Sequence, residues 1–306
     1  MVQKNCVKNK ILIICGATAS GKTSLAIECA KLLNSEIISA DSMNVYKELD
    51  VGTAKPTVIE MDGIKHHLID VVDKEDTFTV SDYKSLARPI IDKLLSENKV
   101  PVICGGTGFY INSILYDLSY GGGEANLEIR DYYKNLASQH GNEFVYEILK
   151  QKDPDTAQKL HFNDLKRVIR ALEICESGIL KSSIKDDYKP VYNYVAYSID
   201  MDRDELYDRI NRRVDLMIEN GLIDEVQKLV DSGITLENQC MQGIGYKEIY
   251  SYIKGELSLD DAVELLKLNT RHYAKRQITF FKRLPNLRMI KKDDVKLMAS
   301  RIVNEL

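Results

Sequence analysis

The stretch GATASGKTS, from Gly16 to Ser24, decides the fold. It matches the pattern G-x-x-x-x-G-K-[ST], a loop whose backbone N–H groups wrap around a phosphate chain. The apolar run ILIIC, from Ile11 to Cys15, leads into this loop and is typical of a buried parallel strand. Apolar residues with helical spacing follow from Leu25. Strand, glycine loop and helix stand in the required order, so the stretch predicts a phosphate site rather than an ordinary glycine turn.

The residue types in the loop indicate how it would bind a ligand. Backbone N–H groups and the N-terminus of the following helix attract an anion. Lys22 adds a positive charge, and the hydroxyl of Thr23 is placed to hold Mg²⁺. Most loops of this kind bind ATP or GTP, but the pattern alone leaves open whether this one holds another diphosphate. The predicted phosphate-binding residues are Gly16, Ala17, Thr18, Ala19, Ser20, Gly21, Lys22 and Thr23.

Composition limits the class of protein. The chain has 306 residues, of which 44% are hydrophobic and 29% charged, which suffices for one large core or two modest ones. No apolar run approaches the ~18 residues of a membrane span, and the basic N-terminus has no separate apolar stretch. We therefore expect no transmembrane helix and no signal peptide. The six cysteines form no C-x-x-C pair, so we expect a reduced, cytoplasmic protein without a zinc site.

The distribution of charge is more informative than its sum. A net charge of −4 does not by itself indicate a nucleic-acid partner. However, the 22 residues from Arg271 to Lys292 hold eight Lys or Arg and no Asp or Glu. The aromatic residues Tyr273, Phe280 and Phe281 lie between these charges, a mixture that suits phosphates and unstacked bases. Taken alone, the segment fits a nucleic-acid surface and a solvated helix face equally well.

Strands and helices alternate over the first 115 residues. Such alternation predicts a parallel sheet that is covered on both faces and binds ligands at the carboxyl ends of its strands. The glycine-rich break SYGGGEAN, from Ser119 to Asn126, ends the alternation, and only helical patterns follow up to about Tyr188. Residues 181–190 are predicted to be a linker. Further strands are predicted at 36–40, 66–72, 100–108, 194–199 and, as a candidate, 287–290, with a long helix over 258–283.

These patterns predict the α/β class, with a P-loop, nucleotide-kinase-like parallel sheet core and a helical insertion domain. The core is expected to comprise residues 1–118 and 190–306, and the insertion residues 119–189.

The acid best placed for chemistry is Asp41. An NTPase of this architecture usually has a second acid that holds Mg²⁺ at the end of a strand. The strand over 100–108 ends in glycines, and Asp70 and Asp73 follow only a short apolar run. Asp41 directly follows the strand over 36–40, at the sheet edge that carries the glycine loop, where it could accept a proton from an acceptor molecule. Asp is also common in turns and helix caps, but the pattern favours group transfer.

Seven ordered blocks resemble the tRNA dimethylallyltransferases, also called tRNA isopentenyltransferases, over nearly the whole chain. The blocks are GATASGKT, SADSMNVYKELDVGTAKP, HHLIDVVD, GGTGFY, DPDTAQKLHFNDLKRVIRALEI, GIGYKEI and RHYAKRQITFFKR. The resemblance implies transfer of a dimethylallyl group from dimethylallyl diphosphate to the exocyclic amine of the adenine just 3′ of the anticodon in tRNA. It implies that the glycine loop and Mg²⁺ hold the leaving diphosphate.

The resemblance also implies roles for single residues. Lys22 would stabilise the leaving diphosphate, Asp41 would accept the amine proton, and Thr107 would lie near the reacting groups. Arg213 would grip the diphosphate, and we expect Arg209 to share its helix face.

The tRNA surface follows from the resemblance as well. The insertion and the basic C-terminal helix would clasp the anticodon stem-loop of tRNA, and the adenine would leave its stack to reach the donor. Separately, we expect the enzyme to be a monomer. The implied tRNA-binding residues are Asp41, Ser42, Met43, Asn44, Thr107, Arg130, Lys166, Arg167, Arg170, Gln242, Gly243, Ile244, Gly245, Tyr246, Lys275, Arg276 and Gln277.

Three positions depart from the family pattern. Ala17 stands where Pro is usual, Asn44 where Gln is common and Phe280 where Trp is common. Three other functions compete: an adenine-nucleotide prenyltransferase of the cytokinin type, an ATP-dependent small-molecule kinase, and a nucleic-acid-binding NTPase. The basic insertion and C-terminal helix favour tRNA over a free nucleotide, and a kinase needs a magnesium-holding acid that the sequence does not provide.

Overall fold

The computed structural model describes residues 10–119 and 126–306. The chain divides into two compact units: one formed by the residues up to Leu115 together with Pro190–Leu306, the other by Tyr116–Lys189. Most of the glycine-rich break predicted over 119–126 lies outside the described residues. Within the described residues, no helix is both long and apolar enough to cross a membrane.

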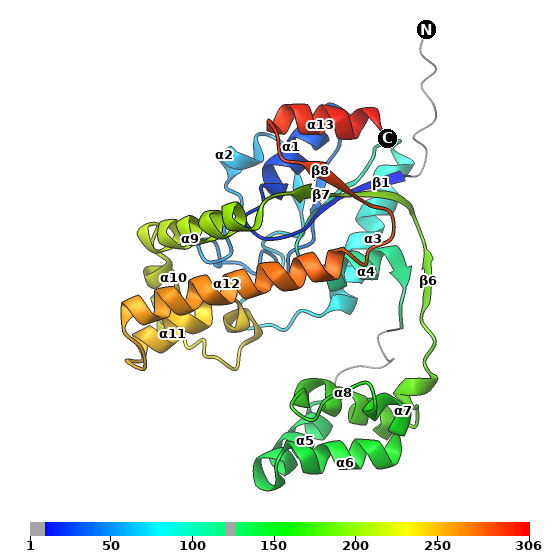
Figure 1. Cartoon of the computed structure of the whole chain (residues 1–306), viewed down its shortest axis with the longest axis vertical. Helices are drawn as coiled ribbons and strands as arrows, with labels where there is room; N and C mark the ends of the chain where they lie inside the picture. Colours follow the sequence, from blue (N-terminus) through cyan, green and yellow to red (C-terminus); the bar gives the residue numbers. More distant parts are fainter. Residues whose placement is uncertain (1–9, 120–125) are drawn as a thin grey trace. The chain divides into compact units, whose positions relative to one another are not determined.

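The first unit contains a parallel sheet of six strands (Figure 1), which confirms the predicted α/β class. The strand order is β3–β2–β4–β1–β7–β8, so the strand that leads into the glycine loop lies inside the sheet. The bounds are β1 (Lys10–Cys15), β2 (Ile37–Ser39), β3 (His66–His67), β4 (Val102–Gly105), β7 (Asn193–Asp200) and β8 (Leu287–Lys291).

Burial explains why β1 is apolar at every position after Lys10. Ile11 to Cys15 are fully buried, because β1 pairs with β4 on one side and β7 on the other. Leu12 lies opposite Val102 in β4 and Val195 in β7. A strand covered on both faces has no polar side, so it shows a continuous apolar run rather than alternation.

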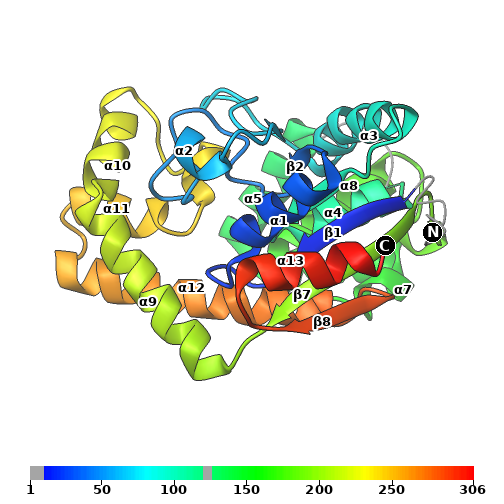
Figure 2. The same ribbon diagram turned by 90° about the horizontal axis from the view of Figure 1, so that it is seen from above.

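Helices cover both faces of this sheet, as Figures 1 and 2 show. On one face, Leu25 and Cys29 of α1 share a buried cluster with Met298 and Ile302 of α13. The helices that flank the sheet are α1 (Lys22–Leu33), α3 (Val80–Ser96), α4 (Gly108–Leu115), α12 (Leu259–Phe281) and α13 (Val295–Asn304).

A second group of helices lies beyond the sheet edge in the same unit (Figure 2). α9 packs against α12, and α11 packs against both α10 and α12. Their bounds are α9 (Arg203–Glu219), α10 (Leu222–Asp231), the short helix η2 (Gln239–Gln242) and α11 (Tyr246–Ile253); the four-residue α2 (Val58–Met61) follows β2.

The second unit is a small helical bundle with its own core. Tyr133, Val145, Leu149, Val168 and Leu172 are buried together, so helical spacing correctly predicted this part. The bounds are α5 (Leu127–His140), α6 (Asn142–Lys152), α7 (Pro154–Ala157), α8 (Leu165–Glu176) and η1 (Lys181–Ser183), with a two-stranded ribbon of β5 (Tyr116–Asp117) and β6 (Asp187–Pro190).

The structure corrects two details of the sequence interpretation. The linker predicted over 181–190 contains η1 and β6, and all four residues of β6 are exposed, so no apolar pattern marks this strand. The strand predicted over 66–72 is reduced to two residues. Leu68 and Asp70 adopt positive φ angles of 60° and 55°, a backbone conformation that strands do not use.

We predict that Gly105→Ala strongly destabilises the first unit. A Cβ atom on Gly105 would lie 2.1 Å from the carbonyl oxygen of Ala40, so two neighbouring backbones would have to separate. Overpacking usually costs about 1–3 kcal/mol, and no side-chain rotation can relieve this clash, so we expect a loss at or above the upper value in urea unfolding. Gly255→Ala is the control, because Gly255 has a φ of +74° but open space around it. Equal losses in the two variants would contradict the close approach.

Candidate active site

The glycine loop at the end of β1 has the curvature of a phosphate-binding turn. Gly16 and Gly21 adopt φ angles of 129° and 95°, and Ala19 adopts 60°. Residues other than glycine rarely adopt such positive φ angles. Helix α1 begins at Lys22, directly after the loop. The free N–H groups of its first turn therefore face the space that the loop encloses.

Two side chains from other helices hold the loop in place. The buried Gln277 of α12 accepts a hydrogen bond from the backbone N–H of Thr18 (2.8 Å) and donates to the carbonyl of Gly106 (3.0 Å). Arg209 of α9 donates from Nε to the carbonyl of Ala19 (2.8 Å). Gln277 was predicted to contact tRNA, but in the structure it bridges the loops that follow β1 and β4.

Two partly buried cations, Lys22 and Arg213, lie beside this loop. Burial lowers the pKa of Lys22, whose Nζ donates to the carbonyl of Ala17 (2.6 Å). Burial also lowers the pKa of Arg213, while the nearby Asp41 favours the charged form of both cations. Lys22, Asp41 and Arg213 line the same small hollow of about 80 Å³, together with Thr18 and Thr23. Because burial disfavours both positive charges, an anionic ligand in this hollow would be strongly attracted.

Asp41 and Thr107 lie in the loops that follow β2 and β4. One oxygen of Asp41, Oδ1, accepts hydrogen bonds from the backbone N–H groups of Met43 (2.9 Å) and Asn44 (3.4 Å). The turn role that Asp often plays is therefore present, and it occupies one of the two carboxylate oxygens. The hydroxyl of Thr107 accepts from the backbone N–H of Ser42 (3.0 Å) and donates to its hydroxyl (3.3 Å).

A cavity of about 320 Å³ adjoins these groups. One part of its wall is polar, with Asp41 and Arg213, and another is apolar, with Ile210, Val214 and Leu266. Cavities of this size and mixed lining are typical of small-ligand sites. The cavity gathers ten of the predicted residues: Thr18, Asp41, Ser42, Met43, Arg213, Gln242, Gly243, Ile244, Tyr246 and Arg276.

Sequence reasoning missed part of this wall. Ile210, Val214 and Met217 stand at helical spacing on α9, which could have indicated an apolar face one residue away from Arg213. Tyr273 also lines the cavity, and burial raises its pKa. In the sequence it stands out only as an aromatic residue between basic ones.

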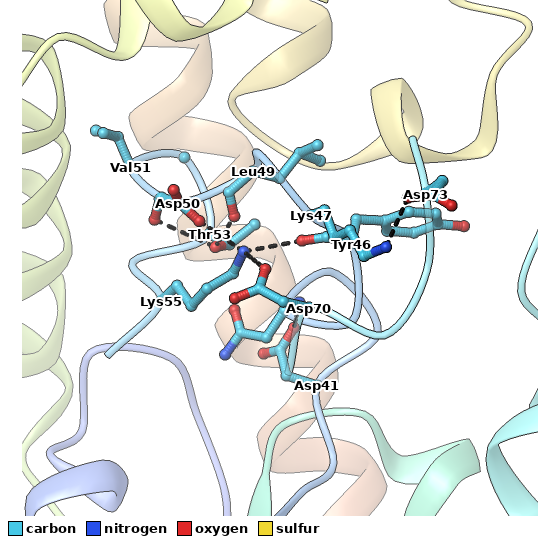
Figure 3. A network of polar contacts seen from close by, with 12 residues as sticks. Asp41, Tyr46, Lys47, Leu49, Asp50, Val51, Thr53, Lys55, Asp70 and Asp73 are labelled. Atoms are coloured by element: carbon cyan, nitrogen blue, oxygen red, sulfur yellow. Dashed lines mark hydrogen bonds and ion pairs between the residues drawn. The ribbon is translucent and has the colours of Figure 1, made fainter. Parts of the chain in front are cut away.

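The segment after β2 is held by a lysine with a buried side chain, whose role the block SADSMNVYKELDVGTAKP did not reveal. Lys55 has a side chain only 5% exposed, and its ammonium donates to the carbonyl of Tyr46 (2.8 Å) and to the carboxylates of Asp50 (2.6 Å) and Asp70 (2.5 Å) (Figure 3). The backbone N–H of Asp70 donates to the carbonyl of Asn44 (3.1 Å). The turn that contains Asp41 is thus fastened to the segment after β3.

The remaining predicted residues lie apart from this cavity or inside the second unit. Lys275 is exposed on α12, and Gly245 precedes α11 with a φ of 104°. In the second unit, Arg130 and Arg170 both bind Glu173, whose side chain is only 4% exposed. Burial alone would raise the pKa of Glu173, but the hydrogen bonds from these arginines and from the backbone N–H of Asn126 together outweigh it and lower the pKa.

Lys166 and Arg167 differ from their neighbours in the second unit. Both are exposed on α8, and Arg167 forms an i,i+3 ion pair with Asp164 (3.4 Å). These two side chains are available to a partner without the loss of a buried ion pair.

Comparison with known proteins shows to which family the chain belongs. The model of the family described as IPP transferase matches residues 44–284. A tRNA dimethylallyltransferase of Acetivibrio thermocellus is 49% identical over 290 residues, which cover 94% of this chain and 93% of the relative. The enzyme of the same name from Alkaliphilus metalliredigens is 47% identical over 280 residues, which cover 90% of each chain.

Solved structures agree with the sequence relatives. The crystal structure of a tRNA isopentenylpyrophosphate transferase from Bacillus halodurans superposes with a TM-score of 0.74 at 42% identity, covering 97% of this chain and 95% of that one. A eukaryotic dimethylallyltransferase acting on tRNA gives a TM-score of 0.82 at 27% identity, over 97% of this chain and 77% of that one. The chain therefore belongs to the IPP transferase family, whose curated relatives are the tRNA dimethylallyltransferases.

Proposed function

We propose that this chain transfers a dimethylallyl group from dimethylallyl diphosphate to the exocyclic amine of the adenine 3′ of the anticodon in tRNA. The observation that carries the proposal is the placement of two partly buried cations, Lys22 and Arg213, together with the carboxylate of Asp41 beside a partly apolar cavity. The relatives that cover nine-tenths or more of the chain carry the name of this activity. Neither a small-molecule kinase nor a free-nucleotide prenyltransferase is favoured.

The reaction exchanges one bond for another. The bond between the allylic carbon and the diphosphate oxygen breaks, and the electron pair leaves with the diphosphate. A new bond forms between that carbon and the amine nitrogen, and the amine proton passes to Asp41. In this proposal the glycine-loop N–H groups, Lys22 and Arg213 stabilise the charge that develops on the diphosphate. The apolar wall of the cavity receives the hydrocarbon part of the donor.

Mg²⁺ is proposed as a cofactor of the donor side. Among the described residues there is no group of three or more His, Cys, Asp or Glu that could hold a metal by itself. Thr23 is exposed and lines the hollow beside the loop. This donor set fits Mg²⁺ held by the Thr23 hydroxyl, by water and mainly by diphosphate oxygens, a common arrangement for this ion. Bound there, the ion would neutralise charge on the leaving group.

The tRNA contacts are proposed to lie on both units. Arg276 of α12 lines the cavity, and its guanidinium lies 5.7 Å from the centre of the Tyr273 ring. Basic and aromatic groups at a cavity mouth suit an unstacked base. Lys166 and Arg167 are proposed to contact phosphates of the anticodon stem. We also propose, as the sequence led us to expect, that the enzyme is a cytoplasmic monomer.

The proposed activity is tested by mass spectrometry of nucleosides. The purified protein, dimethylallyl diphosphate and an anticodon stem-loop are incubated together, and the RNA is digested. We expect a dimethylallyl group on the adenine 3′ of the anticodon and on no other base. If the protein is shown to be folded and the RNA remains unmodified, the proposal is refuted.

Lys22→Ala should strongly decrease the turnover rate and leave the affinity for tRNA nearly unchanged. The lysine stabilises charge on the leaving diphosphate, and the loss of one such preorganised group costs on the order of 10²-fold or more. Rates at saturating donor and tRNA affinities would be measured side by side, with Lys31→Ala at the other end of α1 as the control. A variant that keeps its rate at saturation but loses tRNA affinity would show that the loop has another role.

Asp41→Asn separates base catalysis from positioning. Asn keeps an oxygen that can accept the N–H groups of Met43 and Asn44, so the turn should survive, but it cannot take a proton. We expect single-turnover transfer to slow by about 10²–10⁴-fold, the usual share of general-base catalysis, with much smaller changes in substrate binding. A rate within about fivefold of the parent, about 1 kcal/mol of barrier, would reduce Asp41 to an anchor for the base.

Charge reversal at Lys166 and Arg167 should weaken tRNA binding for all sequences alike. Contacts with phosphates carry no sequence information, and their loss should flatten the dependence of affinity on salt. Arg170 is left unchanged, because its ion pair with the buried Glu173 would confound binding with folding. The control reverses Lys134 and Lys150, two exposed lysines of the same unit. If both double variants show the same salt dependence, the tRNA surface lies elsewhere.

A further inference from the structure

The carboxylate of Glu225, on α10, joins two segments that are distant in the sequence. Its Oε2 accepts hydrogen bonds from the backbone N–H groups of Asp50 (2.9 Å) and Val51 (2.8 Å), and its Oε1 accepts from the N–H of Gly52 (3.0 Å). The same Oε1 accepts from the hydroxyl of Tyr246 (2.6 Å). One side chain therefore satisfies three successive N–H groups after β2 and one phenol at the start of α11.

This arrangement needs a carboxylate. Three successive backbone N–H groups that converge on one point attract an anion, and hydrogen bonds to an ionised acceptor are stronger than those between neutral groups. A glutamine has the same shape, but one of its two terminal groups is a donor. In Glu225→Gln, that donor would face N–H groups that also need an acceptor.

The two joined segments pack tightly against one another. A Cβ atom on Gly52 would lie 2.7 Å from the ring of Tyr246, and Tyr246 is fully buried. A Cβ atom on Gly243 would lie 2.6 Å from the terminal methyl carbon of Met43, whose N–H donates to Asp41. The segment that contains Gly243 and Tyr246 therefore touches both ends of the loop that carries the proposed base.

Both segments also form walls of the 320 Å³ cavity. Gly52 and Thr53 line one side, and Gly243 and Tyr246 line another, whereas Glu225 is not among the lining residues. A change at Glu225 can therefore reach a ligand in this cavity only through the walls.

We propose that Glu225 is a positioning residue, which fixes the distance between these two walls and thereby the place of Asp41 relative to the substrates. The proposal rests on the function proposed above. It assigns to Glu225 no contact with donor or tRNA.

A simpler role for Glu225 is stabilisation of α10, since acids in the first turn of a helix favour its dipole. Asp224 provides the matched control. It lies in the same turn of α10 and carries the same charge, but it is exposed and is not part of the contacts described above. Asp224→Asn and Glu225→Gln change the helix dipole interaction alike, so only the second should affect the cavity walls.

The experiment compares parent, Asp224→Asn and Glu225→Gln in single-turnover transfer to an anticodon stem-loop, at saturating donor. We expect Glu225→Gln to lose about 10- to 100-fold, since a displacement of about 1 Å can cost this much. Affinity for inorganic diphosphate should stay nearly unchanged, because Gln277 and Arg209 hold the glycine loop. Hydrogen–deuterium exchange should rise over residues 41–53 and 242–246. Asp224→Asn should stay within about twofold of the parent.

Equal rates and equal exchange in Glu225→Gln and Asp224→Asn would overturn the positioning role. If Glu225→Gln does not fold, Glu225→Asp replaces it, because the shorter acid keeps the charge but cannot reach both segments; a folded Glu225→Asp with the parent's rate would equally overturn the role. Absence of transfer in the parent would instead refute the proposed function. Exchange needs no substrate, so it would still decide whether Glu225 holds the two walls.

Discussion

The parallel pairing of β2, β4 and β1 is the constraint on which the site depends. Parallel strands bring their carboxyl ends to one edge, so the loops that follow these three strands must meet there. The loop after β2 contains Asp41, the loop after β4 contains Thr107, and the loop after β1 is the glycine loop. Gln277 then ties the loops after β1 and β4 together with two hydrogen bonds. The sheet brings the reacting groups close together, and the side chain of Gln277, on α12, fixes the distance between the loops after β1 and β4.

The electrostatic balance of the site suits a dissociating diphosphate. Lys22 and Arg213 are both partly buried, and this burial lowers the pKa of each. In the absence of an anion this is a costly arrangement, offset in part by Asp41. A diphosphate would compensate both cations, and its charge increases as the allylic bond breaks. The same groups would therefore stabilise the transition state more than the ground state, which is the requirement for catalysis.

The sequence was informative where one local pattern determined one local structure. The apolar run at Ile11–Cys15 and the glycine loop correctly predicted β1, its turn and the start of α1. The exposed strand β6 was missed because its residues face water and show no periodicity. Lys55 and Glu225 were missed for a different reason. Each acts on backbone groups whose positions depend on the tertiary fold, and an isolated Lys or Glu in a charged sequence gives no sign of such contacts.

The family resemblance supplied what local patterns could not. Asp41 stood out by its place after a strand, which already suggested that it could accept a proton; the amine as the source of that proton and the role of Arg213 came from the resemblance. The structure adds that both residues line the same cavity. Conversely, Arg130 and Arg170, which the resemblance implied as tRNA contacts, hold a buried glutamate, so their positions also have a structural explanation.

In the proposed reaction, the glycine loop holds the diphosphate of a prenyl donor and not that of a nucleotide. The most direct measurement follows both phosphate products in one reaction that contains the protein, dimethylallyl diphosphate, ATP and an anticodon stem-loop. We expect one inorganic diphosphate to be released for each base modified, none without RNA, and no consumption of ATP. Release of orthophosphate from ATP in step with base modification, or diphosphate release that does not depend on RNA, would contradict the proposed reaction.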